Sequence, residues 1–538
     1  MFLEATVKNV SIAPLRLNLV PILIVIWLSE TAAQSPSVID IGTRRELMID
    51  DYLIGSFEGE AALKLYHPVR REIALVNGEQ PWEGNGCGYY TIMQDGDKYR
   101  MYYHAWHIPV DGGQEHPLVI AYAESDDGVR WVKPRLGIVE FRGSKKNNIV
   151  LKEINGKRAH DFSPFKDSNP DCAPDAVYKA IGLGQSPTGL YAFKSKDAIH
   201  WETYGTQPVF VESGWVFDSQ NITFWSETEK RYVLYYRNAP VGKAGQDGVT
   251  SGNRARNIAR ATSEDYIHWT KEGLLEYTNR PPTLLQQYYT NQIKPYYRAP
   301  HLYIGFPACY VDRGWQRATL LLPSPDLRKQ RAKTQPRNGS VVTDSLIMTS
   351  RDGTTFHTWD EAFLRPGLKT RHNWAYGDNY VAWHVVETQS TFDDAPRELS
   401  LYATESYFTG KSSRLRRYTL RIDGFASVHA PYRGGEVITK PLRFSGSELR
   451  FNFATAAAGT IRAEIQDESG KPFDGYSLKE SEVLFGDSLD QTIYWKNGSD
   501  VGAMAGKVVQ LRIVLSDADV YAFRFVGKER STTEDSEG

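Results

Sequence analysis

Short runs of apolar and aromatic residues, separated by turn-forming residues, predict that the chain is built mainly of β-strands. The clearest runs lie at 99–104, 177–182, 231–236 and 301–306, where tyrosine, valine, leucine and isoleucine are frequent. Aromatic and β-branched side chains favour strands, and runs of this length are typical of strands rather than helices. The pattern therefore indicates the all-β class.

A strand-and-turn unit recurs four times along the chain. Each copy ends in Ser-x-Asp, three further residues and an aromatic residue, and the four aromatic residues are Trp131, Trp201, Trp269 and Phe356. They are 70, 68 and 87 residues apart, and a looser fifth unit lies at 380–405. Because a four-stranded propeller blade takes about 40 to 50 residues, each unit fits one blade with long loops. The repeat predicts a five-bladed β-propeller.

The repeated turn residues are predicted to be structural rather than functional. An aspartate at this position bonds the backbone of its own turn, and the aromatic residue packs between neighbouring sheets. The run at 46–49 is predicted to close the ring by joining the last blade, which would remove open sheet edges.

The apolar pattern changes near residue 441. Apolar residues then alternate at period two, as at Val509, Leu511, Ile513 and Leu515, and turns separate the runs. The fold predicted is thus a five-bladed β-propeller over 35–438 followed by a small β-sandwich domain over 439–527. The charged tail at 528–538 is predicted to be disordered.

The N-terminal segment 1–34 has the pattern of a signal peptide. Lys8 and Arg16 precede or open an apolar run at 17–28, and small residues follow at 31–33. The alternative, a membrane anchor, needs about 20 apolar residues, and this run is shorter. The sequence therefore predicts a secreted or periplasmic protein that has no membrane contact after cleavage.

The composition argues against a nucleic-acid partner and against a metal site made of cysteines. The formal net charge is −2 and no Lys/Arg cluster is interleaved with aromatics, so no nucleic-acid partner is expected. The 13 Trp, 31 Tyr and 22 Phe suit strands and also sites that stack on sugars. Cys87, Cys172 and Cys309 lack metal-ligand spacing and are predicted to be buried thiols.

Carboxylates recur where the inner strands of the blades begin. In a propeller these strand starts meet at one mouth of the central channel, and four of the five carry an acid: Glu83, Asp161, Asp218 and Asp378. Glycoside hydrolysis needs a protonated acid and a second carboxylate, and crowding keeps one acid protonated. The alternative is that these acids cap turns or hold a structural cation in the channel. No cofactor is required for the hydrolytic hypothesis.

Further residues near the strand starts are candidates for binding a carbohydrate substrate. The set is Asn85, Asn291, Arg298, His301, Trp374 and Asp378. The cationic members would bind an anionic group on a sugar, and the tryptophan would stack on a ring. Surface salt bridges and core packing are the alternatives.

The turn Ser195-Lys196-Asp197-Ala198-Ile199-His200-Trp201-Glu202 resembles the blade-end turn of five-bladed glycoside hydrolases of families 32 and 43. The chain from 46 to 526 also resembles a group of exported bacterial family 32-like hydrolases. The resemblance implies that Glu83, Asp161 and Asp218 are the catalytic acids. The chain departs from family 32 in three places: Glu83-Gly84-Asn85-Gly86 replaces the Asn-Asp-Pro-Asn-Gly run, and the Arg-Asp-Pro and Glu-Cys motifs are absent.

The function expected is that of an exported glycoside hydrolase that cleaves a polysaccharide or oligosaccharide. The alternatives are a non-catalytic carbohydrate-binding propeller and a surface interaction protein. Two carboxylates about 5 to 10 Å apart at the mouth favour an enzyme, whereas acids held in buried ion pairs favour the alternatives.

Overall fold

The structure is a computed structural model that describes residues 38–239 and 255–527. The predicted signal peptide and the predicted disordered tail lie outside these residues. Within them, no helix has the length and apolar content needed to cross a bilayer. Cys87 and Cys309 are buried, as predicted, Cys172 is half-buried, and all three thiols are free.

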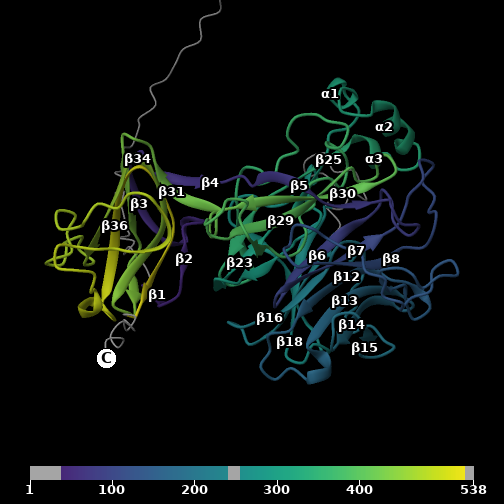
Figure 1. The fold of residues 1–538 in the computed structure, drawn as a ribbon, viewed down its shortest axis with the longest axis horizontal. Helices are drawn as coiled ribbons and strands as arrows, with labels where there is room; N and C mark the ends of the chain where they lie inside the picture. The colour runs from purple at the N-terminus through teal and green to yellow at the C-terminus, as the bar shows by residue number, and fades with distance from the viewer. Residues whose placement is uncertain (1–37, 240–254, 528–538) are drawn as a thin grey trace, which may run out of the picture. The chain divides into compact units, whose positions relative to one another are not determined.

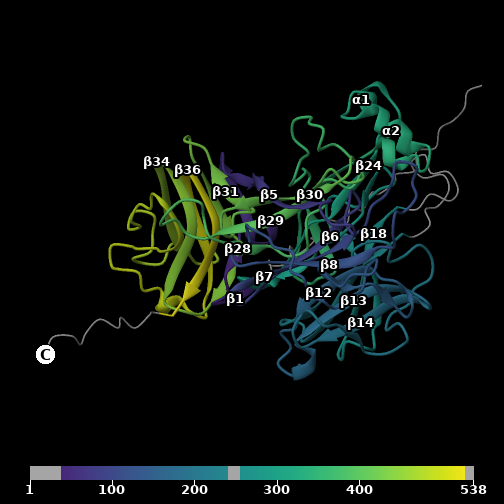
Figure 2. The ribbon, with the colours of Figure 1, turned by 45° about the vertical axis from the view of Figure 1, so that its right-hand side comes forward.

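Five sheets form the predicted propeller (Figures 1 and 2). Blade one has β6 (Gly88–Asp95), β7 (Lys98–Ala105), β8 (Val119–Ser125) and β9 (Ile149–Leu151). Blade two has β12 (His160–Lys166), β13 (Tyr178–Gln185), β14 (Thr188–Ser195) and β15 (Glu202–Thr203). Blade three has β16 (Ile222–Ser226), β17 (Arg231–Asn238), β18 (Asn257–Ser263) and β19 (Thr270–Leu274). In each blade the first strand is innermost, and neighbours pair antiparallel.

Blade four carries an insertion. Its sheet contains β22 (Lys294–Tyr296), β23 (Ala299–Gly305), β26 (Met348–Ser350), β27 (Thr355–Thr358) and β20 (Glu276–Tyr277). A separate small sheet is made of β21 (Gln286–Tyr288), β24 (Ala308–Asp312) and β25 (Val341–Ser345). The helices α1 (Arg317–Leu320), α2 (Pro325–Ala332) and α3 (Arg337–Ser340) connect β24 to β25, and Figure 1 shows the three helices near β25.

Blade five closes the ring with a strand from the start of the chain. Its sheet contains β28 (Val386–Thr388), β29 (Glu398–Glu405), β30 (Ser413–Leu420) and, outermost, β5 (Val69–Asn77). Backbone bonds from Ile92 N to Trp383 O at 2.9 Å and from Trp383 N to Tyr90 O at 2.8 Å join blade five to blade one. The ring is thus closed, but by a later strand than the predicted 46–49.

The repeated turns are built as the sequence predicts. In the first, Asp127 Oδ1 accepts hydrogen bonds from the backbone N–H groups of Val129 and Arg130, both at 2.8 Å. The same aspartate contacts recur in the other three turns. Tyrosines from neighbouring blades hold the turns in place: Tyr102 OH donates to Ala198 O at 2.6 Å. The repeat therefore joins successive blades.

The second domain draws strands from both ends of the described chain. Its ten strands are β1 (Ile39–Gly42), β2 (Glu46–Leu47), β3 (Ile54–Gly59), β4 (Ala62–Leu65), β31 (Ala426–Ala430), β32 (Gly435–Thr439), β33 (Leu442–Phe444), β34 (Glu448–Gln466), β35 (Asp487–Thr492) and β36 (Val508–Val526). Figure 1 shows the N-terminal strands, in purple, among the C-terminal ones. Their apolar faces enclose one core that includes Phe451, Trp495 and Phe523.

This topology corrects the predicted boundaries. The sequence predicts a propeller over 35–438, yet the strands within 39–65 and 426–439 pair in the sandwich. In particular, β2 pairs with β36, at Glu46↔Phe523. The short N-terminal strands carry no signal that distinguishes a blade edge from a sandwich edge, because both are short, alternating and half-buried.

Candidate functional site

Asp161 and His160 form a buried pair at the start of β12. Asp161 is 0% exposed and has φ +53°, a left-handed conformation that aspartate tolerates better than most residues. His160 Nδ1 lies 2.6 Å from Asp161 Oδ2. The backbone N–H of Asp161 donates to His104 Nε2 at 2.8 Å, which fixes that nitrogen as an unprotonated acceptor. The turn thus points the carboxylate at His160.

The environment shifts the pKa values of Asp161, His104 and His160. Burial raises the pKa of Asp161 to about 6, against an opposing effect of His160. Burial lowers the pKa of His104 well below its usual range. For His160 burial acts downward, but the neighbouring Asp161 outweighs it, and the pKa of His160 is raised. The Asp161–His160 pair therefore holds a proton near neutral pH.

Asp218 supplies a second carboxylate beside this pair. It precedes β16, its side chain is 47% exposed, and Oδ2 lies 3.1 Å from Arg237 Nη2. Burial opposes ionisation, but Arg237 and then His160 lower the pKa of Asp218. Asp218 in turn raises the pKa of Asp161. The two acids are therefore close enough to interact, and their pKa values move in opposite directions.

Arginine and tyrosine side chains surround Asp218. The guanidinium of Arg237 lies 4.7 Å from the ring centroid of Trp215 and 5.5 Å from that of Tyr289. Tyr376 OH donates to Tyr289 OH at 2.8 Å. This cluster, like His104 and His160, is absent from the site predicted from the sequence, because its members come from strands and loops spread across several blades. The one local signal was the placement of His160 beside Asp161.

His104, His160 and Asp161 are also the set of side chains, within the described residues, whose spacing would suit a metal ion, with ligand atoms within 4.8 Å of one another. The lone pair of His104 Nε2 is already used by the N–H of Asp161. A cation here would therefore be held by His160 and Asp161, without that nitrogen of His104. The cation stays a prediction.

Glu83, the third acid of the predicted catalytic set, lies in a structural ion pair. Its side chain is 0% exposed, and Lys133 Nζ lies 2.8 Å from Oε2. Tyr103 OH donates to Oε1 at 2.6 Å. Gly86, three residues on, packs so closely that a Cβ would lie 2.6 Å from Trp106 Nε1. The Glu83–Gly86 run is thus a packing and ion-pair motif, which corrects its assignment to catalysis.

The two predicted asparagines and Asp378 have backbone partners. Asn85 Nδ2 donates to the carbonyls of Ile108 and Gly410, both at 3.0 Å. Asn291 Nδ2 lies 3.3 Å from Gln220 O. The oxygens of Asp378 accept from Ala375 N at 2.9 Å and Tyr407 N at 3.0 Å. These side chains are buried and hold loops, which does not fit the predicted role in substrate binding.

Burial raises the pKa of Asp378 to about 8, despite those two hydrogen bonds. Its carboxyl group holds the loop segments that carry Tyr376 and Tyr407.

The remaining predicted residues also lie away from Asp161 and Asp218. Arg298 Nε lies 2.9 Å from Asp423 Oδ1, after the last blade strand. His301 Nε2 lies 3.3 Å from Glu46 Oε2, in β2 of the sandwich. Trp374 Nε1 donates to Gly367 O at 2.8 Å, and its side chain lines a cavity by β24 and β25. The structure therefore unites Asp161 and Asp218 alone among the nine predicted positions.

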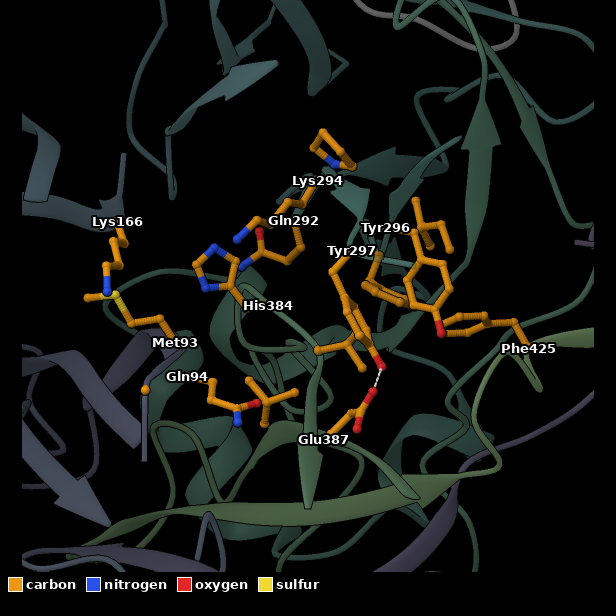
Figure 3. Close-up of a pocket in the computed structure, with 16 residues that line it drawn as sticks. Met93, Gln94, Lys166, Gln292, Lys294, Tyr296, Tyr297, His384, Glu387 and Phe425 are labelled. Carbon is orange, nitrogen blue, oxygen red and sulfur yellow. Dashed lines mark hydrogen bonds between the residues drawn. The ribbon is translucent and has the colours of Figure 1, made fainter. Parts of the chain in front are cut away.

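A second cavity, of about 460 Å³, lies at the opposite ends of the inner strands. Its lining includes Met93 and Lys166, which lie near the ends of β6 and β12, whereas Asp161 begins β12. Figure 3 shows Gln292, Lys294 and His384 on one side and Tyr296, Tyr297 and Phe425 on the other. Burial lowers the pKa of Lys294 to about 8. This cavity has no paired acids of the kind found near Asp218, within the part described.

Sequence comparisons give partial relatives. No family model matches the chain. Two curated Mycobacterium tuberculosis proteins, "Uncharacterized protein MT1551" and "Uncharacterized protein Rv1502", are each 27% identical to it over 150 residues. The match covers 27% of this chain and 45% of each relative, so the chain spans less than half the length of the curated proteins it matches.

The solved structures that resemble the chain include glycoside hydrolases. One titled "Glycoside hydrolase" is 12% identical, with a TM-score of 0.39, over 65% of this chain and 92% of its own. A fructofuranosidase from Schwanniomyces occidentalis, complexed with fructosylnystose, is 13% identical, with a TM-score of 0.36, over 92% and 100%. A GH32 β-fructofuranosidase from Bombyx mori is 12% identical, with a TM-score of 0.34, over 86% and 94%. All three TM-scores are below 0.5, so the case for the fold and for activity rests on the sheets and the site residues themselves.

Proposed function

We propose that the protein is a glycoside hydrolase whose acid pair consists of Asp161 and Asp218. The observation that carries the proposal is the opposite displacement of their pKa values, upward for Asp161 and downward for Asp218. A two-carboxylate glycosidase needs one protonated group that donates a proton to the leaving oxygen. It also needs one ionised group that acts as nucleophile or base. At neutral pH Asp218 is the ionised group, and the proton is held by the coupled pair of Asp161 and His160.

His160 is the group that transfers the proton in this proposal. The Asp161 carboxyl is fully buried, whereas the His160 side chain is 13% exposed and contacts Asp161 through Nδ1. Nε2 of the same ring is then free to face a substrate. Asp161 orients the imidazole and stabilises its protonated form, and the imidazolium gives its Nε2 proton to the glycosidic oxygen. Asp218, ionised and exposed, attacks the anomeric carbon or activates a water molecule.

The test is turnover of a panel of oligosaccharides by the full chain and by His160→Gln and Asp218→Asn variants. A general acid or base contributes typically about 10²- to 10⁴-fold in rate, so each variant should lose at least about a hundredfold in kcat. Glu83→Gln is the matched control, because it neutralises a buried acid outside the pair. It should keep kcat in its folded fraction and melt at a lower temperature.

Full turnover in both His160→Gln and Asp218→Asn would reject the assignment. The alternative, a carbohydrate-binding propeller without catalysis, predicts saturable glycan binding by the unmodified chain with no reducing ends released. Melting curves of all three variants separate lost chemistry from lost folding.

A further inference from the structure

Three arginines converge on Tyr289 beside the proposed acid pair. Arg256 lies 4.9 Å from the Tyr289 ring centroid, 4.4 Å from that of Tyr310 and 4.5 Å from that of Trp215. Arg237 shares the rings of Trp215 and Tyr289. Arg337, at the start of α3, lies 5.1 Å from the ring centroid of Tyr376, whose hydroxyl bonds Tyr289. The cluster therefore combines three fixed positive charges with an aromatic wall.

These charges are incompletely neutralised by the protein. Arg237 is 2% exposed, and its Nη2 forms an ion pair with Asp218, but none of its three guanidinium nitrogens has a hydrogen-bond partner among the described residues. Arg256 is 5% exposed, and its Nη1 donates to the neutral Gln287 Oε1 at 2.6 Å. Arg337 Nε donates to another neutral group, Gln335 Oε1, at 3.0 Å. Within residues 38–239 and 255–527, Asp218 is the carboxylate that forms an ion pair with any of the three.

Buried positive charge that lacks an opposite charge is costly, so the excess of Arg237 and Arg256 over Asp218 favours binding of an anion. The ionisation of Tyr289 reports the same positive field. Burial alone would raise its pKa, yet Arg337, together with Arg237 and Arg256, lowers the pKa of Tyr289 below its usual value. The lowered pKa of Tyr289 therefore indicates a positive electrostatic potential in the cluster, which attracts negative charge.

We propose that Arg237, Arg256 and Arg337 bind the anionic group of an acidic sugar, a uronate carboxylate or a sulfate ester. Guanidinium groups present planar donors that match such oxyanions in bidentate geometry. Trp215, half-buried beside two of the arginines, offers a face on which a sugar ring can stack. The inference rests on the proposed function for one point, that this acidic unit adjoins the bond cleaved next to Asp218.

The direct test is calorimetric binding of three monosaccharide glycosides to the full chain: methyl glucuronide, methyl glucoside 6-sulfate and methyl glucoside. The first two arms distinguish carboxylate from sulfate ester, and the third is the neutral control. At least one acidic glycoside should bind at least tenfold more tightly than the neutral one, and its affinity should fall as salt rises. Equal affinity for all three would overturn the proposal.

Variants locate the binding to the cluster. Arg256→Gln and Arg337→Gln should each weaken acidic-sugar binding at least tenfold. Arg337→Lys should have an affinity between those of the parent and Arg337→Gln, because lysine keeps the positive charge but lacks the planar guanidinium donors. Arg317→Gln, the same change at an exposed residue of α1, is the control and should bind like the parent. Unchanged affinity in both glutamine variants, with parental melting, would also overturn the proposal.

The two proposals fail in different ways. Binding needs no turnover, so selective binding of an acidic sugar without hydrolysis rejects the proposed function and keeps this inference. Hydrolysis of neutral glycans, with no preference for acidic ones, does the opposite.

Discussion

The buried Asp161 carboxyl makes stability depend on pH in a defined direction. Its pKa is about 6 in the folded protein and about 3.9 in an unfolded chain. As pH rises above about 4, the unfolded chain releases this proton first, so the folded state loses relative stability until the pH passes about 6. The contribution is thus fully present below pH 4 and absent at pH 7.

Asp161→Asn removes this titration. Between pH 4 and pH 7 the parent should lose up to about 3 kcal/mol that the variant keeps, from a shift of about two units at 1.36 kcal/mol each. Urea unfolding at a series of pH values measures the difference. Parallel stability profiles for parent and variant would contradict the pKa shift of Asp161.

For single residues, the positions of the acids could be predicted from the sequence, but the side chains that surround each acid could not. Asp161 and Asp218 were predictable, because inner strands of a propeller start at one mouth. Glu83 fulfilled the same rule and yet lies in an ion pair with Lys133, fifty residues away. Nothing local in a sequence states which cation a buried carboxylate will meet. The arginine cluster was hidden for the same reason.

Among the elements, the blade-end turns were the most predictable, and their tryptophans carry the second stability prediction. The Trp201 ring contacts Phe162, with centroids 5.1 Å apart, and Tyr102 at 6.1 Å, both edge-on. It is half-buried, so Trp201→Ala should cost roughly 2 to 4 kcal/mol, somewhat less than for a fully enclosed ring.

Thermal unfolding of Trp201→Ala checks that value. His200→Ala is the companion variant, because its ring is exposed and bonds Asp197 within the same turn; it should change stability by less than about 1 kcal/mol. Equal melting of Trp201→Ala and the parent would show that the ring does not hold blade one to blade two.

Strand order was less predictable than strand position. The repeat gave the five blades because each blade is a local hairpin series, and local turns are specified by a few residues. Closure of the ring depends on β5 pairing with β30, at Ser413↔Asn77, across more than three hundred residues. Any short edge strand of suitable alternation satisfies that role, so the sequence favoured 46–49 where the structure uses Val69–Asn77.

For the whole molecule, β36 is the strand on which the sandwich depends. It pairs with β2, β31, β32, β33 and β34, and its apolar face places Leu511, Ile513 and Phe523 in the core. A chain that ends at residue 507 should therefore fail to form the sandwich and should aggregate, because the unpaired edges and the exposed core invite association. Solubility and calorimetry of the shortened chain test this, and a parental melting profile would refute it.

The pairing of β1–β5 with strands late in the sequence also determines when these strands can pair during synthesis. At about 5–20 residues per second, roughly 20 to 70 s separate the appearance of β5 from that of its partner β30. The strands β1–β4 wait longer still, for β31 to β36. The strands that are synthesised first are therefore among the last to pair, and a nascent chain exposes them longest. Any factor that shields the N-terminal strands of a growing chain would improve the yield of folded protein.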